Sequence, residues 1–460
     1  MSTAEQQSPR SATTRGSSDG TRVEPDSNVD AETSPPVHAT SVGGMDDSVV
    51  PMVPRRRWRL RRLITLPVKL FIGVIFTQSM LLSVLVIGWT HRLMQRSALK
   101  TWHRRRGEQA TCPAAFVDFA RGTQAADVTA GDAAAAAGNR SADDLWREHA
   151  RAPHWIIHAN PILRVRRGAA EKKHIRAAIA ATFGSLGVNF KLGLQGLLTT
   201  WTLTLPAGLL WLASWWGGWN NSFNKGYEHA AVGPAVGVLG VVLFIAAMTY
   251  APIAQARQAV TGDWRTFYDF RFNRRLIRRA AIGSLVIAAS YALLGAVAMG
   301  LKTGPLFFQY GDAMDAMTDA EVLKHLNTYY FWSGVVVFIS FVGLRLLASR
   351  TYAKALAGAV RDRAVSPDSL HLYERRALGE FDLLRPATDR ARPVVVRAAV
   401  WTTANVARWG LVSLVCVFWF AFVASIFVSE FLNYHPYIGF LNQPLVQLPF
   451  FKYVPAPLTP

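Results

Sequence analysis

The chain has 460 residues, of which 51% are hydrophobic and 17% are charged, and its formal net charge is +20. Its mean hydropathy is positive, at +0.16. This composition excludes an intrinsically disordered chain, a collagen and a coiled coil. The two cysteines, Cys112 and Cys416, exclude a disulfide scaffold and a four-cysteine zinc site. The basic charge alone would suit nucleic acid or an anionic surface, whereas 15 Trp and 25 Phe suit a membrane.

Residues 1–54 are predicted to form a disordered, acidic tail that is rich in Ser and Pro. Over residues 1–50, three arginines stand against eight acidic residues, and no apolar periodicity is present. Such a segment cannot offset the entropy lost on ordering. It also lacks an apolar core near its start, so we do not expect a signal peptide.

Six apolar stretches are each long enough to cross a bilayer as a helix, which takes roughly 17–25 residues. They cover residues 68–89, 192–212, 232–251, 280–301, 330–347 and 409–428. Trp and Tyr gather near their ends, as they do at membrane interfaces. No stretch alternates strictly, which disfavours a transmembrane barrel. The sequence therefore predicts an all-α, polytopic helical membrane protein with about six transmembrane helices plus amphipathic surface helices.

The connections between these stretches differ in charge. Residues 252–279 and 348–408 carry many arginines, whereas the other connections after the second stretch carry few basic residues. By the positive-inside rule, these two basic connections face the cytoplasm. The first stretch does not fit the pattern, because residues 55–62 and 92–106 are both basic. The side of the N-terminus stays open, as does the choice among a full span at 68–89, a re-entrant helix there, and an extra segment at 175–190.

These observations divide the chain into five parts. The tail is followed by a first membrane helix with basic flanks, an extramembrane linker, a helical membrane domain and an aromatic, Pro-rich C-terminal tail. The last four parts cover residues 55–106, 107–175, 176–432 and 433–460. For the C-terminal tail, a strip that lies on the membrane or covers the bundle is the simpler interpretation, and a re-entrant lid or docking strip is the alternative.

The connection after the third stretch is the most distinctive part of the sequence. Aromatic and apolar residues recur there at helical spacing, and Asp263 can cap the start of a helix over residues 261–279. An aromatic face with a basic surround is typical of a helix in the headgroup layer, so we expect contacts with anionic lipid headgroups. The residues expected to make these contacts are Trp264, Arg265, Phe267, Arg274, Arg275, Arg278 and Arg279. An ordinary surface connector is the simpler interpretation.

A second helix is predicted on the same side, over residues 366–384. Ser366 can cap it and Pro367 suits its first position. Its apolar face is expected to pack on a neighbouring helix or on the bilayer, or to bind a partner. Within the apolar stretches, Arg345 is expected to extend its charge to the cytoplasmic interface. Pro206, in the second stretch, marks the best place for a helix break, although a plain kink is the simpler interpretation.

Three histidines cluster in the linker, at His149, His154 and His158. His154 and His158 lie four residues apart and could share a helix face as a metal pair. No Glu lies between them as in the zinc-protease pattern, no third ligand is evident, and Pro153 suggests a turn. We find no nucleotide-binding loop or nucleophile elbow either. We therefore expect no catalytic residue, no cofactor and no metal site.

The segments 254–259, 262–265 and 267–271, together with residues 433–436, resemble uncharacterised bacterial polytopic membrane proteins that are grouped under a domain of unknown function. The resemblance covers about residues 190–455. It implies an architecture and a location in a bacterial membrane, and it implies no activity and no catalytic residues.

The first hypothesis is a non-enzymatic scaffold or partner-binding component of the bacterial cytoplasmic (inner) membrane. Its partners would be anionic headgroups on the cytoplasmic side and either another protein or a second copy of the chain. Nucleic acid is not expected, because the basic residues flank the spans. A small-solute transporter or channel, with a polar cavity near residues 206–208, is one alternative. A lipid-modifying membrane enzyme that uses the histidines at 149–158 is another.

Overall fold

The computed structural model describes residues 67–110, 116, 156, 172–214, 232–308, 317–385, 394–418 and 449–452. Within these ranges the chain is all-α, as predicted. They belong to one compact unit, Arg57–Pro460. The predictions for residues 1–54, for most of the linker, for 419–428 and for most of 433–460 lie outside the described residues.

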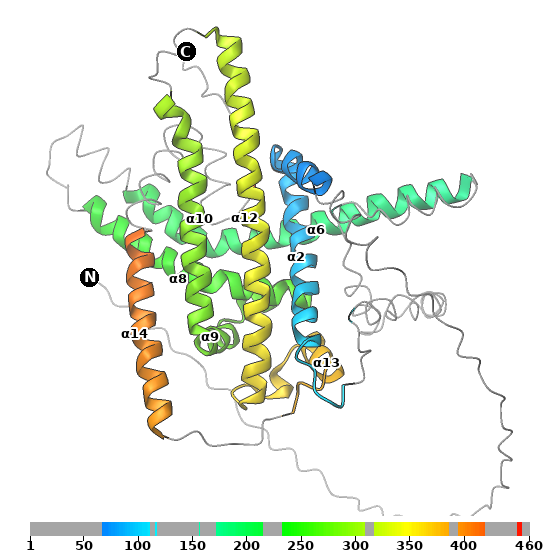
Figure 1. The fold of residues 1–460 in the computed structure, drawn as a ribbon, viewed down its shortest axis with the longest axis vertical. Helices are drawn as coiled ribbons and strands as arrows, with labels where there is room; N and C mark the ends of the chain where they lie inside the picture. The colour runs from blue at the N-terminus through cyan, green and yellow to red at the C-terminus, as the bar shows by residue number, and fades with distance from the viewer. Residues whose placement is uncertain are drawn as a thin grey trace, which may run out of the picture. The chain divides into compact units, whose positions relative to one another are not determined.

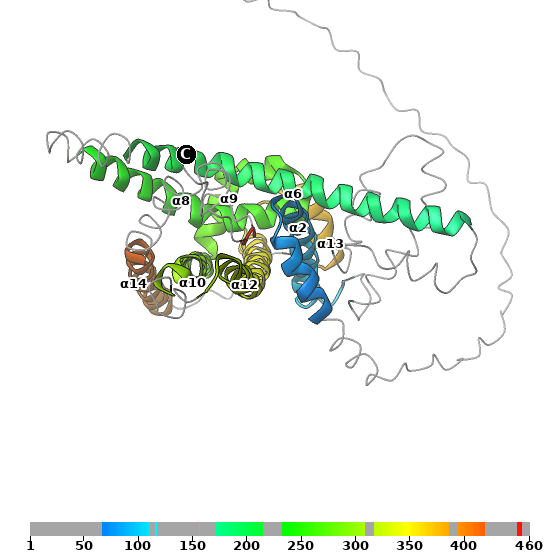
Figure 2. The same cartoon turned by 90° about the horizontal axis from the view of Figure 1, so that it is seen from above.

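The long helices form two layers that cross each other (Figures 1 and 2). The first layer pairs α6 (Lys172–Ser214) with α8 (Val232–Thr261). The second layer consists of α2 (Met80–His103), α10 (Ala281–Phe308), α12 (Asp319–Arg361) and α14 (Val394–Phe418). Both views show α6 and α8 running across this second layer rather than alongside it.

Three helical segments among the described residues are long and apolar enough to cross a membrane. They are Thr182–Ser214, Ala235–Thr261 and Asp319–Arg361, and they contain the second and fifth predicted stretches and most of the third. Two shorter apolar segments are Pro67–Thr77 and Ala281–Tyr291. The all-α prediction is thus confirmed, and three of the six predicted spans have a candidate helix of sufficient length among the described residues.

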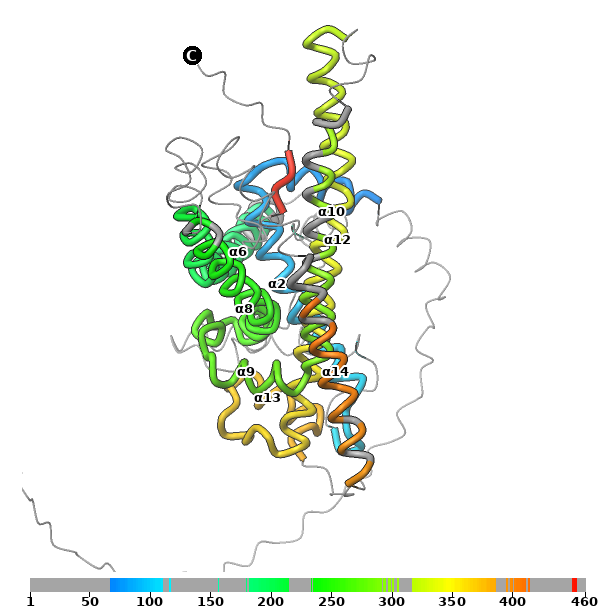
Figure 3. The backbone as a smooth tube through the Cα atoms, turned by 90° about the vertical axis from the view of Figure 1, so that its left-hand side faces the viewer, coloured from blue at the N-terminus to red at the C-terminus, as the bar shows by residue number. Residues whose placement is uncertain are grey.

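The first predicted stretch, residues 68–89, is broken into two helices. One apolar helix covers Pro67–Thr77, and α2 begins at Met80. A C-terminal segment meets this break, as Figure 3 shows in red against blue. The backbone N–H of Phe451 donates to the Thr77 carbonyl at 3.0 Å, and Gln78 Nε2 donates to the Phe451 carbonyl at 2.7 Å. Residues 449–452 therefore lie against the break, where Phe451 gives hydrogen-bond partners to groups of Thr77 and Gln78.

Helix α6 is continuous from residue 172 to residue 214, so the possible extra segment at 175–190 is the first part of the same helix as the second stretch. Pro206 lies inside it without ending it. The helix is therefore not broken at this proline.

The two connections predicted to be cytoplasmic each fold as a short 3-10 helix followed by an α-helix. In the first, η3 (Trp264–Tyr268) precedes α9 (Phe270–Arg279). In the second, η4 (Pro367–Ser369) precedes α13 (Leu372–Glu380). The single helices predicted over residues 261–279 and 366–384 were both wrong, because Asp269 separates η3 from α9, and Leu370 and His371 separate η4 from α13. The capping roles predicted for Asp263 and Ser366 are confirmed, because both side chains accept backbone N–H groups at the starts of η3 and η4.

The crossing of α2 over α6 depends on glycines. A Cβ atom placed on Gly88 of α2 would lie 1.7 Å from the carbonyl oxygen of Asn189 in α6, and one on Gly193 would lie 1.9 Å from the carbonyl oxygen of Val84. Both obstacles are backbone atoms, which cannot turn aside as a side chain can. The two helices therefore approach as closely as their backbones allow, and small residues at both contact points make this possible.

This geometry predicts the effect of adding one methyl group. Replacing Gly88 with Ala should destabilise the purified chain by roughly 1–3 kcal/mol or more, because the layers must separate to admit the new atom. Gly187→Ala in α6 is the matched control, since a Cβ there meets nothing within 4 Å. Thermal unfolding in detergent measures both variants. Equal unfolding midpoints for the two would contradict the close approach.

Candidate functional site

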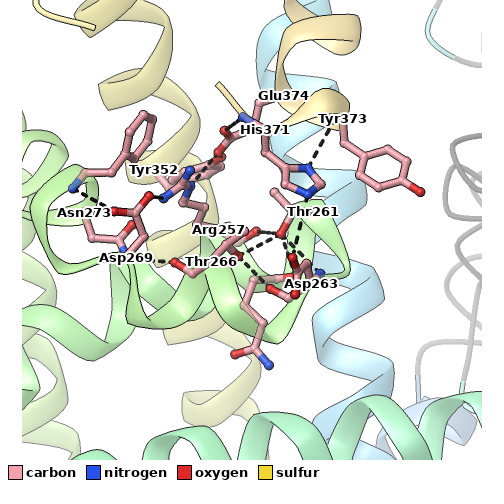
Figure 4. Close-up of polar contacts among 12 residues, drawn as sticks. Arg257, Thr261, Asp263, Thr266, Asp269, Asn273, Tyr352, His371, Tyr373 and Glu374 are labelled. Carbon is pink, nitrogen blue, oxygen red and sulfur yellow. Dashed lines mark hydrogen bonds and ion pairs between the residues drawn. The ribbon is translucent and has the colours of Figure 1, made fainter. Parts of the chain in front are cut away.

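A buried ion pair joins the first layer to the connections at the end of the bundle (Figure 4). Arg257, near the end of α8, donates from Nε to Oε1 of Glu374 in α13 at 2.9 Å. Its Nη1 donates to Oδ2 of Asp269 at 2.8 Å. The side chains of Arg257 and Glu374 are 3% and 0% exposed. A single guanidinium therefore connects α8, α9 and α13.

Glu374 uses both of its carboxylate oxygens. Besides Arg257, Oε1 accepts a hydrogen bond from the hydroxyl of Tyr352 in α12. Oε2 accepts from the backbone N–H of His371 at 2.9 Å, which completes the capping box of α13. A carboxylate in the first turn of a helix is also favoured by the helix dipole. The charge of Glu374 is thus compensated on every side, which a buried carboxylate requires.

Asp269 and Phe272 hold α9 against the same arginine. Asp269 caps α9 by accepting from the Phe272 backbone N–H at 3.3 Å. The guanidinium carbon of Arg257 lies 3.7 Å from the centroid of the Phe272 ring. A planar guanidinium can pair with carboxylates in its plane while its face rests on an aromatic ring, which lysine cannot do. Arg257 therefore fixes both the start and the inner face of α9.

The polar contacts continue from this cluster into η3. The hydroxyls of Thr261 and Thr266 lie 2.9 Å apart. Asn273 donates from Nδ2 to the Tyr250 hydroxyl at 2.9 Å and to the Thr266 carbonyl at 3.0 Å. These buried side chains take up polar groups that the turn between α8 and α9 would otherwise leave unpaired.

His371 links the two connections. Its Nδ1 accepts from the Tyr373 backbone N–H at 3.4 Å, so the proton of the neutral ring sits on Nε2, which lies 3.9 Å from Oδ2 of Asp263. Burial lowers the pKa of His371 below its ordinary 6.5, and Arg257 acts in the same direction against Glu374 and Asp263. The ring is therefore neutral near neutral pH and serves as the cap of α13.

A second polar cluster lies deeper in the bundle, around Arg345 of α12. The expectation that Arg345 extends to the interface was wrong, because the residue is 1% exposed and its Nη1 donates to Oε1 of Gln255 in α8. Gln255 in turn donates to the Thr200 hydroxyl of α6. Crossing layers explain the difference. Helix α8 lies across α12 at this level and covers a side chain that a set of parallel helices would have left free to reach the surface.

The residues predicted to contact headgroups divide into two sets. Trp264 is 46% exposed, and the following five arginines are also exposed: Arg265, Arg274, Arg275, Arg278 and Arg279. Arg279 pairs with Asp362 at the end of α12. Phe267, in contrast, is fully buried against Tyr250, with ring centroids 5.9 Å apart, so it lies in the core. Phe270, which sequence reasoning missed, is 52% exposed.

A local signal would have found Phe270. It follows Asp269 directly, and an Asp that caps a helix sets the next residue at the first helical position, where the inner face has not yet begun. If Asp269 is taken as a cap rather than as part of a continuous helix, the helical periodicity restarts at Phe270. Phe270 then falls on the exposed face. The exposed aromatic pair is thus Trp264 and Phe270 in place of Trp264 and Phe267.

The polar side chains of the described clusters hold helices in position relative to one another. Among the residues that the structure describes, no three His, Cys, Asp or Glu side chains gather as a metal site. Glu374 has hydrogen-bond donors on both oxygens, which leaves it poorly placed as a base. The linker histidines at 149, 154 and 158, and Cys112, lie outside the described residues. Cys416 lies within α14.

The fold and the clusters together define an all-α protein with three candidate membrane-spanning helices and a basic, partly aromatic surface element held by a buried ion pair. No family model, no curated protein and no solved structure matches the chain.

The ion pair gives a direct prediction. Glu374→Gln should destabilise the chain by roughly 3–5 kcal/mol, because it leaves the buried charge of Arg257 with only the half-exposed Asp269. Glu380→Gln, on the same helix, is the control, since its pair with Arg376 is partly exposed and worth only a few tenths of a kcal/mol. Thermal unfolding compares them. A Glu374→Gln variant as stable as Glu380→Gln would remove the central role of the pair.

His371 predicts a loss of stability in acid. Since its folded pKa is lowered, the unfolded chain takes up the proton first, and stability falls as the pH drops below the unfolded value of 6.5 towards the folded one. His371→Asn keeps a capping side chain and cannot titrate, so the part of the acid loss due to this residue should disappear in that variant. Unfolding midpoints from about pH 8 to about pH 5 test this. Identical pH profiles for the two proteins would rule it out.

Proposed function

We propose that the chain is an integral protein of the bacterial cytoplasmic membrane that acts as a non-enzymatic scaffold. The element formed by η3 and α9 contacts anionic headgroups on the cytoplasmic side and presents a surface to a protein partner or a second copy of the chain. Three candidate spans support the membrane location. The described clusters support a positioning role, because their polar groups pair with one another.

The observation that carries the proposal is the surface of the η3–α9 element, which we call the headgroup surface. It comprises Trp264, Arg265, Phe270, Arg271, Arg274, Arg275 and Arg278, all of them exposed. Exposed aromatic rings beside arginines suit the boundary between headgroups and acyl chains. The inner face of α9 is buried through Phe272 and Leu276, so the element is held in place with its charges outward.

The headgroup surface is anchored by ion pairs at both ends of α9. Arg257 and Asp269 hold the start of α9, and Arg279 pairs with Asp362 at its end. A segment fixed at both ends presents its arginines at defined positions. Each such residue near an anionic leaflet contributes about 1 kcal/mol of attraction. A fixed array therefore binds lipid, or an acidic partner surface, without first paying the entropy of ordering.

The complete topology is part of the same proposal. Six transmembrane helices with residues 262–279 and 362–385 in the cytoplasm would satisfy the positive-inside rule from the second span onward. Membership of the resembling group of bacterial membrane proteins is likewise proposed. Its support is that residues 254–271, which carry the resemblance, also supply Arg257, Asp263 and Asp269 to the buried cluster.

Small-solute transport is the second candidate function, and one observation favours it. Among the described residues, buried polar atoms without hydrogen-bond partners include Arg345 Nε of α12, Tyr291 Oη of α10 and His91 Nε2 of α2. These atoms lie on other helices than residues 206–208, where the sequence predicted a polar cavity.

The headgroup surface predicts lipid selectivity. The full chain, purified in mild detergent and incorporated into nanodiscs of mixed phosphatidylglycerol and phosphatidylcholine, should retain phosphatidylglycerol preferentially when native mass spectrometry counts its bound lipids. Changing Arg274, Arg275 and Arg278 together to Gln should abolish most of this preference, because three of the fixed charges are lost.

The matched control changes three other exposed arginines, Arg350, Arg361 and Arg375, to Gln and removes the same total charge. It should keep the preference. An equal loss in both triple variants would assign the selectivity to net charge, which contradicts the headgroup surface. The same spectra report the mass of the assembly, and repeated recovery of the monomer alone would contradict the scaffold role.

A further inference from the structure

Four arginines of α9 form a compact set of exposed charges on a helix of ten residues. They are Arg271, Arg274, Arg275 and Arg278. Each of the four lies three positions from one of the others and four positions from another. Residues at these spacings are neighbours on a helix surface, with about 5–6 Å between their Cβ atoms. The four side chains therefore start from the corners of one patch, which we call the arginine quartet.

Acidic side chains do not relieve the repulsion within the quartet in the described part of the chain. Every acidic residue of segments 262–279 and 362–385 contacts a basic side chain from outside the quartet. These acidic residues are Asp263, Asp269, Asp362, Asp368, Glu374, Glu380 and Asp382. Like charges three or four positions apart destabilise a helix. The quartet thus carries an electrostatic cost that its surroundings do not offset.

The fold holds α9 in place in spite of this repulsion. A helix of ten residues is marginal by itself in water. Here Phe272 and Leu276, which are 5% and 0% exposed, bury its inner face. Arg279, directly after the quartet, forms an ion pair with Asp362 of the next connection. The four like charges are therefore kept close together on a fixed element, and a ligand with more than one negative charge would turn their repulsion into attraction.

The aromatic residues beside the quartet indicate that this ligand is a lipid. Trp264 and Phe270 are 46% and 52% exposed, and Phe270 is the first residue of α9. The guanidinium carbon of Arg265 lies 5.9 Å from the Trp264 ring centroid. Exposed aromatic rings favour the boundary between headgroups and acyl chains. A soluble polyphosphate would use the arginines and leave both rings in water.

We propose that the arginine quartet binds a lipid headgroup that carries two phosphates joined by a short linker. Each phosphate lies between two guanidinium groups, because the planar fork of arginine donates paired hydrogen bonds to phosphate oxygens. Once the first phosphate is bound, the linker holds the second at a high effective concentration. Two separate single-phosphate lipids would each lose the entropy of association. The inference rests on the proposed function, since it names the lipid class that the headgroup surface selects.

The test uses the full chain in phosphatidylcholine nanodiscs. Some discs contain phosphatidylglycerol alone, and others contain phosphatidylglycerol and diphosphatidylglycerol at equal total charge. Native mass spectrometry counts the bound lipids. We expect diphosphatidylglycerol to be enriched over phosphatidylglycerol by about tenfold or more, relative to the composition of the disc. Retention of phosphatidylglycerol in the first discs without this enrichment in the second would overturn the inference and leave the headgroup surface intact. Retention of neither lipid would reject both.

A charge-preserving variant tests the role of the guanidinium fork. Changing Arg274 and Arg278 to Lys keeps both charges and removes the planar donors, so most of the enrichment should disappear while phosphatidylglycerol is still retained. The matched control changes Arg350 and Arg361, which are also exposed, to Lys and should keep the enrichment. Equal enrichment in the two variants would contradict the quartet.

A soluble competitor distinguishes a lipid from a free diphosphate. Inorganic pyrophosphate, compared with sodium chloride at equal ionic strength, should leave the bound diphosphatidylglycerol in place, because it cannot use Trp264 and Phe270. Displacement of the lipid by pyrophosphate alone would overturn the assignment of the ligand as a lipid.

Discussion

The pairing of Arg257 with Glu374 is the constraint on which the described architecture depends. A buried arginine with no carboxylate would cost the fold several kcal/mol, so the helix that carries Glu374 must dock wherever Arg257 lies. This places α13 against α8, although the two partners are 117 positions apart in sequence. The hydrogen bond from the Tyr352 hydroxyl to Glu374 holds α12 at the same point, and the bond from Arg257 to Asp269 holds α9 there. Four elements meet around one guanidinium, and the exposed arginines of α9 are oriented as a result.

The crossing of the two layers depends on a different kind of contact. Gly88 and Gly193 bring the α2 and α6 backbones together without side chains between them. Close approach in turn encloses His91, whose ring faces Gly196 of α6. Small residues therefore have two effects here. They permit the crossing, and they create a buried space in which polar side chains such as His91 and Gln255 lose contact with water. The helix break before α2 is closed by Phe451, which is again a long-range contact.

Local features of this fold could be predicted from the sequence, and the pairings between distant elements could not. The length of the apolar stretches identifies the three candidate spans. The small polar side chains of Asp263 and Ser366 indicate the starts of η3 and η4. Nothing in the neighbourhood of Arg257 or Arg345 distinguishes the two, since both follow apolar runs. Their burial is decided by α8 crossing α12, which is set by contacts about 90 residues apart in sequence, as between Arg345 and Gln255. The exchange of Phe267 for Phe270 on the surface has a simpler cause. A capping Asp269 resets the helical phase, and periodicity measured across it assigns the wrong face.

The contrast between the two buried arginines bears on what the protein does. Arg257 is neutralised by the chain itself, because two carboxylates accept its hydrogen bonds, so its contribution is a fixed shape. Around Arg345 the chain supplies an amide oxygen and an aromatic ring in place of a carboxylate, and Nε has no hydrogen-bond partner among the described residues. A fold that needed only rigidity would be more stable with an apolar side chain at that position, since replacing unpaired buried charge by apolar packing is usually stabilising.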